Sequence, residues 1–275
     1  SYENKNKTSV IPIIDGFKIS SNYVFRRLVK DYYGDKPEEF ISRLHEYNFG
    51  EAYEFELNEQ GSAKPRIPDP QSSGWTMSDL VSVAIGYSVR VTPLQVATFY
   101  NAIANKGRMM KPYVVESHEK NGQVVKEFKP TLLNGSICSK ATADTLTRAL
   151  KMVTLEGTAS KLKNAKCTIA GKTGTTNDNA DGWFMGFTPS LVSGVWVGGE
   201  ERDIHFDNMR DGQGAEMALP IWGLYMNKVY ADKSLGYLQT DTFAIPHGFD
   251  PCKDILADDE APAIKESTGL DDMFQ

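Results

Sequence analysis

The chain has 275 residues, of which 40% are hydrophobic and 24% are charged. This is the balance of a folded protein with one or two domains. A formal net charge of -6 without a basic block argues against nucleic acid as a partner. No segment has the roughly 20 apolar residues of a bilayer-spanning helix, and the N-terminal SYENKNKTSV lacks the apolar region of a signal peptide. Because the chain also lacks an initial Met, we expect it to begin inside a longer protein, with any anchor outside these residues.

The first half of the chain is predicted to be mainly helical. The apolar period in YVFRRLVKDYY predicts a helix with Ser20 or Ser21 as its N-cap. A second helix, over about 37–48, has Asp35 and Glu38 at the spacing of a capping box. The elements expected next are a loop over 57–77, a helix from Thr92 to about Asn105, a hairpin around Asn121-Gly122 between 113–115 and 124–125, and a helix from Ser139 to Gly157.

The second half of the chain changes to short β-rich segments separated by turn residues. The expected consecutive antiparallel strands are Cys167–Ala170, Trp183–Phe187 and Leu191–Val197. A helix over 217–231 follows, so the order is that of an α+β domain with helices flanking an antiparallel sheet. We expect this domain to occupy residues 1–239 and the acidic residues 240–275 to form an extended or disordered tail.

The sequence offers no metal site. The three cysteines, Cys138, Cys167 and Cys252, form no CxxC pair and are expected to be small buried thiols. The four histidines are scattered, and none lies at helical spacing from another ligand type. We therefore expect no metal and no other cofactor.

The segment IAGKTGTT, over residues 169–176, has the residues of an acyl-transfer site. On a strand, Thr173 and Thr175 point to the same face, and Lys172 places a cation beside an acylating centre. At Gly174 a substrate backbone can approach and pair with the strand. The N–H of Thr175 is a candidate oxyanion donor. A polar turn of Lys, Thr and Gly between two strands is the alternative.

A second motif, Ser20-Ser21-Asn22, precedes the first helix and has a simple N-cap as its alternative reading. Ser-x-Asn and Lys-Thr-Gly in this order, about 150 residues apart, are two of the three signatures of β-lactamases and penicillin-binding proteins. The segments SSNYVFRRL, IGYSVRVTPLQVATFYNAIANKGRMMKP, EGTASKLKN and IAGKTGTTNDNADGWFMGFTP resemble high-molecular-mass penicillin-binding proteins. The chain resembles class B as far as the Lys-Thr-Gly motif and class A from Thr175 onward.

The resemblance implies an incomplete domain of the serine β-lactamase and penicillin-binding-protein transpeptidase fold. It also implies a D,D-transpeptidase that transfers an acyl group from D-Ala–D-Ala stem peptides and that β-lactams inhibit. In this scheme Ser20 relays a proton with Lys172 as its partner, and Asn22 binds the substrate amide. Thr173 and Thr175 bind the terminal carboxylate along the strand at Gly174. The implied place is the bacterial cell envelope, outside the inner membrane, and the implied partners are stem peptides, β-lactams and the cell-wall synthesis machinery.

The third signature of the family, the nucleophilic Ser-x-x-Lys, does not precede Ser20. It occurs at Ser117–Lys120 and at Ser160–Lys163, after Ser-x-Asn instead of before it. We therefore expect the nucleophile before residue 1. The chain alone should form no covalent adduct with a labelled penicillin and should be less stable than the full domain.

Two alternatives stay open. One is a hydrolase of the same fold, either a β-lactamase or a D,D-carboxypeptidase, although no Glu stands out as a base for a hydrolytic water. The other is a catalytically silent module that binds penicillin or stem peptides. A Ser-x-x-Lys some tens of residues before Ser1 would indicate an enzyme, and its absence would favour the binding module. The rate of amine transfer compared with hydrolysis in the full-length protein distinguishes a transpeptidase from a hydrolase.

Overall fold

The computed structural model describes residues 11–54 and 64–244, which belong to one compact unit. Residues 245–275, which are nearly all of the expected tail over 240–275, lie outside the described residues. The first part of the predicted loop over 57–77 also lies outside them. In the part of the chain that the structure covers, no helix has both the length and the apolar content needed to cross a bilayer.

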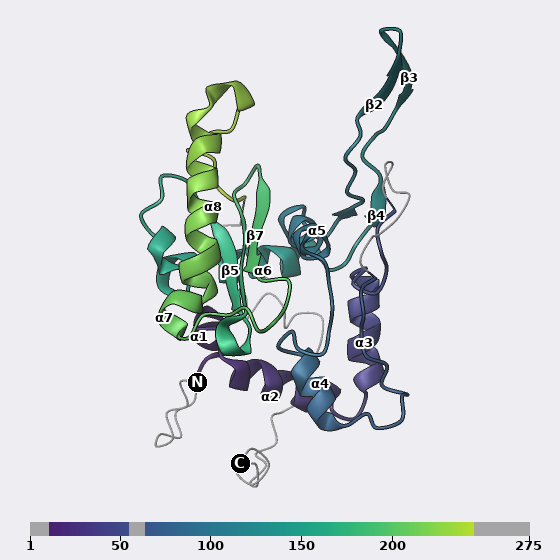
Figure 1. The fold of residues 1–275 in the computed structure, drawn as a ribbon, viewed down its shortest axis with the longest axis vertical. Coiled ribbons are helices and arrows are strands. Elements are labelled where there is room, and N and C mark those ends of the chain that lie inside the picture. Colours follow the sequence, from purple (N-terminus) through teal and green to yellow (C-terminus); the bar gives the residue numbers. More distant parts are fainter. Residues whose placement is uncertain (1–10, 55–63, 245–275) are drawn as a thin grey trace. The chain divides into compact units, whose positions relative to one another are not determined.

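The α+β prediction is confirmed (Figure 1). The helices are α1 (Ile13–Lys18), α2 (Asn22–Tyr33), α3 (Pro37–Glu46), α4 (Met77–Val83), α5 (Pro93–Ala104), α6 (Lys140–Glu156), α7 (Met209–Gly212) and α8 (Gly214–Ala231). The strands are β1 (Met109–Met110), β2 (Ser117–Lys120), β3 (Gln123–Glu127), β4 (Leu132–Asn134), β5 (Ala170–Thr175), β6 (Asp181–Phe187) and β7 (Val192–Gly198). Short 3-10 turns are η1 (Ser160–Leu162), η2 (Asn177–Asn179) and η3 (Lys233–Leu235).

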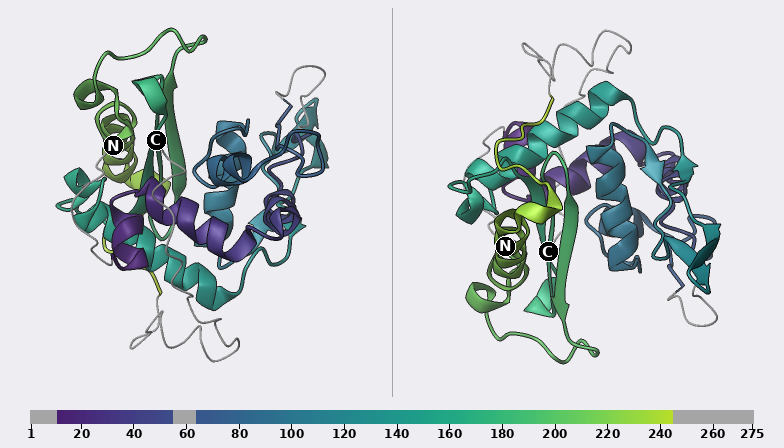
Figure 2. Two further views of the ribbon diagram at one scale, coloured as in Figure 1. Left: turned by 90° about the horizontal axis from the view of Figure 1, so that it is seen from below. Right: turned by 90° about the horizontal axis from the view of Figure 1, so that it is seen from above.

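The strands β5, β6 and β7 form an antiparallel sheet in that order, with α8 and α5 on opposite faces (Figures 1 and 2). On one face, the ring of Phe184 packs edge-on against Trp222 of α8, with their centroids 5.1 Å apart. On the other face, Phe187 packs with Ile103 of α5 and Leu150 of α6. The alternation of side chains along β6 therefore supplies both halves of the core.

Local signals placed several helix ends correctly. Thr92 and Gln95 form the predicted capping box at the start of α5, with Pro93 as the first helical residue. The hydroxyl of Ser139 accepts from the Thr142 N–H at 3.0 Å and caps α6. These caps use groups within three residues of one another, so the sequence was sufficient to find them.

The capping box predicted for the second helix is wrong. Lys36 is the N-cap of α3, and it makes no side-chain cap bond. Because Pro37 lacks an N–H and has a fixed φ, it takes the first helical position and leaves Glu38 one residue short of the capping-box position. The short helices α1 and α4 were not predicted.

Several strand boundaries also differ from the prediction, most of all in β5 and β2. The strand predicted over Cys167–Ala170 begins only at Ala170, because the ladder with β6 runs from Ala170 opposite Phe187 to Thr175 opposite Gly182. The first strand of the hairpin is β2 and not 113–115. Asn121 and Gly122 have φ values of 54° and 76°, as a two-residue hairpin turn requires, and β2 ends and β3 begins directly beside this turn.

Candidate active site

Ser20 lies at the corner between α1 and α2, where its backbone has a positive φ of 58°. The Ser20 N–H donates to the Phe17 carbonyl at 3.1 Å, and the Ser21 N–H donates to the Gly16 carbonyl at 2.9 Å. This pair of bonds is the Schellman motif that ends a helix, with Ser20 in the position that glycine usually takes. The left-handed conformation costs a residue with a side chain about 1–2 kcal/mol, and such strain is typical of functional sites.

Ser21 and Asn22 start the next helix at the same corner. The hydroxyl of Ser21 accepts from the Val24 N–H at 3.4 Å, so Ser21, and not Ser20, is the N-cap of α2. Asn22 is the first residue of α2 and is exposed. The cap function of Ser21 leaves the Ser20 side chain available for a different contact.

That contact is with Lys172 on β5. The ammonium Nζ of Lys172 donates to Ser20 Oγ at 2.7 Å and to the Thr173 carbonyl at 3.1 Å. Burial lowers the pKa of Lys172 from 10.5 to about 8, because the charged form loses water. Among the described residues, no carboxylate forms an ion pair with Lys172. The structure thus joins the predicted serine and lysine across 152 positions of the chain.

β5 is an edge strand. Of the described strands, only β6 pairs with it, so its other edge is unpaired. The Thr176 N–H just beyond β5 donates to the Asp181 carbonyl at 3.1 Å. Alternation along the antiparallel ladder then turns the Thr175 N–H toward the unpaired edge. This is the orientation that an oxyanion donor needs.

The two threonines of the motif lie on one face of β5, and both make contacts within the protein. The Thr173 hydroxyl is 2.6 Å from the Thr158 hydroxyl, and Thr173 is 9% exposed. The Thr175 hydroxyl oxygen accepts from the Gly214 N–H of α8 at 2.9 Å, which leaves its own hydrogen available to a substrate carboxylate. A Cβ at Gly174 would lie 3.1 Å from the Trp183 side chain, so packing also favours glycine at this position.

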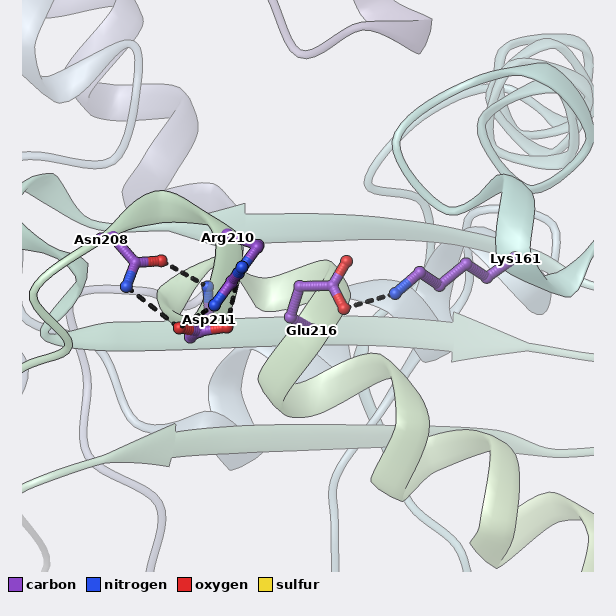
Figure 3. Close-up of polar contacts among 5 residues, drawn as sticks. All are labelled: Lys161, Asn208, Arg210, Asp211 and Glu216. Atoms are coloured by element: carbon purple, nitrogen blue, oxygen red, sulfur yellow. Dashed lines mark hydrogen bonds and ion pairs between the residues drawn. The ribbon is translucent and has the colours of Figure 1, made fainter.

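Polar contacts surround the start of α8, within α7 and between α8 and η1 (Figure 3). Asn208 caps α7 by accepting from the Asp211 N–H at 3.0 Å, and its amide donates to the Asp211 carboxylate at 3.0 Å. Glu216, in the first turn of α8, forms an ion pair with Lys161 of η1. These contacts support the corner that presents the Gly214 N–H to Thr175.

One contact at the rim of the site was not predicted. The hydroxyl of Tyr87, in the segment between α4 and α5, accepts from the Asn177 N–H at 2.6 Å. This bond ties the turn after β5 to the helical region that begins with α2. Tyr87 lies within the segment IGYSVR, but its sequence carries no signal for a contact 90 residues away.

The two Ser-x-x-Lys segments lie on other elements. Ser117–Lys120 is strand β2 of the hairpin, and Ser117 Oγ contacts Glu119 at 3.3 Å. Ser160–Lys163 spans η1, where Lys161 pairs with Glu216. Among the described residues, neither segment has a hydrogen bond to Ser20 or Lys172.

The sequence matches a known family over most of its length. The family model described as "Penicillin binding protein transpeptidase domain" matches residues 1–199. The chain belongs to the penicillin-binding protein transpeptidase family. The penicillin-binding protein 1A of Aquifex aeolicus (strain VF5) is 39% identical over 153 residues, which are 54% of this chain and 20% of that protein. That of Neisseria lactamica is 34% identical over 152 residues, 53% of this chain and 18% of that protein. The matches thus span about a fifth of these relatives' length.

Solved transpeptidase structures have the same fold. The D,D-transpeptidase domain of a peptidoglycan glycosyltransferase from Eggerthella lenta has a TM-score of 0.65 at 24% identity, covering 83% of this chain and 56% of that one. Penicillin-binding protein A from M. tuberculosis, as an imipenem acyl-enzyme complex, has a TM-score of 0.63 at 19% identity, covering 81% and 48%. The predicted change from class B-like to class A-like sequence at the Lys-Thr-Gly motif stays a prediction.

Proposed function

We propose that this chain forms the Ser-x-Asn and Lys-Thr-Gly side of a peptidoglycan D,D-transpeptidase site. The supporting observation is the 2.7 Å hydrogen bond from Lys172 to Ser20, which joins the two motifs. The domain over residues 1–239 is the unit that we assign to this activity. The protein acts outside the cytoplasmic membrane, at the bacterial cell envelope, where it cross-links stem peptides that end in D-Ala–D-Ala.

In the proposed mechanism, Lys172 and Ser20 deliver a proton to the leaving group. With a pKa of about 8, Lys172 is mostly protonated at neutral pH but gives up its proton more easily than an exposed lysine. Because the ammonium donates to Ser20 Oγ, the Ser20 hydroxyl hydrogen points elsewhere and can pass to the leaving amine. Lys172 then returns a proton to Ser20.

Asn22 and β5 bind the donor peptide in this scheme. The peptide adds as a strand along the unpaired edge at Gly174, and Asn22 donates to one of its amides. The Thr175 hydroxyl hydrogen binds the terminal carboxylate, with Thr173 beside it. The Thr175 N–H stabilises the oxyanion, and loss of such a donor typically costs about 3–4 kcal/mol in the transition state.

β-Lactams are the inhibitors that fit this proposal, since they acylate the nucleophile in place of the donor peptide. M. tuberculosis penicillin-binding protein A forms an acyl-enzyme with imipenem. Further proposed partners are other proteins of the cell-wall synthesis machinery.

We also propose that the nucleophile comes from a segment outside this chain. Within the described residues, 11–54 and 64–244, neither Ser117 nor Ser160 is hydrogen-bonded to Ser20 or Lys172. The chain incubated with a labelled penicillin should therefore show no mass increase by intact-mass spectrometry. An adduct mapped to either serine would overturn this part of the proposal.

The activity itself is tested in a longer polypeptide from the same gene that supplies a Ser-x-x-Lys segment. We expect fluorescent penicillin to label it, and D-amino acid amines to be incorporated faster than water hydrolyses the acyl-enzyme. Lys172→Met should abolish both reactions, whereas Lys120→Met, on the exposed hairpin, should leave them unchanged. Hydrolysis without amine transfer would indicate a hydrolase, and penicillin binding without turnover of peptide would indicate a binding module.

A further inference from the structure

We propose that the turn Glu156-Gly157-Thr158, between α6 and η1, is a positioning element that holds Ser20 at hydrogen-bond distance from Lys172. The proposal rests on the function proposed for these two residues and assigns no chemical step to the turn itself. We call residues 156–158 the brace. It contacts the chain on both sides of the Ser20–Lys172 bond.

The first side of the brace is its contact with Lys18, two residues before Ser20. The Thr158 N–H donates to the Lys18 carbonyl at 3.1 Å, and the Lys18 ammonium donates to the Glu156 carboxylate at 3.0 Å. Gly157 lies so close that a Cβ would be 2.4 Å from the Lys18 carbonyl oxygen. All three residues of the brace therefore contact one residue at the end of α1.

The second side is its contact with β5. The Thr158 hydroxyl is 2.6 Å from the hydroxyl of Thr173, the residue after Lys172. Thr173 is 9% exposed, so this hydrogen bond is shielded from competing water. A single residue, Thr158, thus binds α1 through its backbone and β5 through its side chain.

The brace is itself anchored in the core. The N–H groups of Gly157 and Ala159 both donate to the Val153 carbonyl of α6, at 3.1 and 3.2 Å. Val153 and Ala159 are fully buried in the core that includes Phe184 and Trp222. The backbone of the brace is therefore bonded directly to the buried core.

Together these contacts close a ring. Hydrogen bonds join Ser20 to Lys172, Thr173 to Thr158, and Thr158 to Lys18, and the chain itself connects Lys172 to Thr173 and Lys18 to Ser20. Ser20 needs this support because its positive φ is unfavourable for a residue with a side chain. If the ring opens, the corner can relax and the Ser20–Lys172 distance increases. A displacement of about 1 Å in such a pair is enough to reduce a rate by roughly 100-fold.

The test uses this chain and needs no turnover, so it can fail or succeed independently of the proposed function. Thr158→Val removes the hydroxyl while keeping the shape and the backbone N–H. Thr158→Ser restores the hydroxyl. Thr145→Val is the matched control, because the Thr145 hydroxyl donates to the Ala141 carbonyl within α6 and, among the described residues, to no group of α1 or β5.

The first readout is the titration of Lys172, followed by NMR of lysine-labelled protein and assigned with Lys172→Met. The wild type and Thr158→Ser should titrate at about 8. In Thr158→Val, water reaches the ammonium, and we expect the pKa to rise by about one unit. The Thr145→Val control should match the wild type.

The second readout is amide hydrogen exchange at Ser20 and Ser21, whose N–H groups form the Schellman motif. Thr158→Val should increase the exchange rate of these two amides by about tenfold. The β6 amides should exchange at the same rate in Thr158→Val as in the Thr145→Val control. Unchanged titration and exchange in Thr158→Val would overturn the proposal, as would an equal increase in amide exchange throughout the sheet.

If Thr158→Val does not fold, Glu156→Gln at the exposed end of the brace replaces it. Faster exchange confined to Ser20 and Ser21 then supports the brace, and unchanged exchange overturns it.

Discussion

Two serine–lysine pairs in this chain have similar chemistry and different surroundings. Ser20 and Lys172 meet in the described structure at 2.7 Å, and burial lowers the lysine pKa to about 8. Ser117 and Lys120 stand in the Ser-x-x-Lys spacing on β2, where Lys120 is exposed and Ser117 contacts Glu119. The difference shows that the tertiary surroundings, and not the spacing along the chain, join Ser20 to Lys172 and lower the pKa of that lysine. It predicts large effects of mutations around β5 and small ones on the β2–β3 hairpin.

The largest effect should come from the core behind β5. Trp222 is 1% exposed and packs on Phe184, so Trp222→Ala should lower the free energy of unfolding by about 3–5 kcal/mol. In the hairpin, Val125 is 68% exposed, and Val125→Ala should change the free energy of unfolding by less than about 0.5 kcal/mol. Urea unfolding followed by circular dichroism measures both. Similar losses in the two variants would contradict the comparison.

The next effect compares two glycines. A Cβ at Gly214 would lie 2.3 Å from the Gly174 carbonyl oxygen, so Gly214→Ala should cost about 1–3 kcal/mol and move α8 away from β5. Gly122 has open space around it, and Gly122→Ala costs only about 1–2 kcal/mol for its positive φ. NMR shifts at Thr175 separate the variants, since only Gly214→Ala should change them. A change at Thr175 in Gly122→Ala would show that the hairpin is coupled to the site.

The pH dependence of stability sharpens the comparison further. Because the folded-state pKa of Lys172, about 8, lies below its ordinary 10.5, the unfolded chain binds more protons between these pH values. The contribution of Lys172 to stability therefore rises with pH across that window. Lys172→Met should remove this rise, and Lys120→Met should preserve it. Urea unfolding midpoints of the three proteins at pH 7.5 and pH 10 test this. Other groups also titrate in this range, such as Tyr100, whose pKa is raised by burial, and the comparison with the wild type removes their contribution because all three proteins share them. Parallel pH profiles in all three proteins would contradict burial of Lys172.

The smallest effect should come from a helix cap near neither serine–lysine pair. The Thr92 hydroxyl accepts from the Gln95 N–H at 3.2 Å, and Thr92→Ala should cost about 1 kcal/mol. Thr92→Ser keeps the hydroxyl and serves as the control. Thermal unfolding should show a lower midpoint only for Thr92→Ala, with the Lys172 titration unchanged. A loss as large as that of Trp222→Ala would mean that α5 depends on its cap more than on the core.

The sequence by itself determined the features that depend on neighbouring residues. The capping box of Thr92 and Gln95, the Ser139 cap and the Asn121-Gly122 turn use groups within a few residues of one another. The two-residue period of a strand is likewise enough to place Thr173 and Thr175 on one face. The resemblance to the penicillin-binding family also implied that Ser20 and Lys172 act together, although no local signal brings them into contact.

Only the tertiary structure decided how the site is held. It assigned the N-cap to Ser21 and put Ser20 in a left-handed conformation, because the unpredicted helix α1 ends there. It also placed the half-buried Lys172 against Ser20 and joined Thr158 to both Lys18 and Thr173. These contacts link segments far apart in the chain, and their free energy depends on the exclusion of water by the assembled core. Local sequence cannot report that exclusion, because it arises only when the helices cover the sheet.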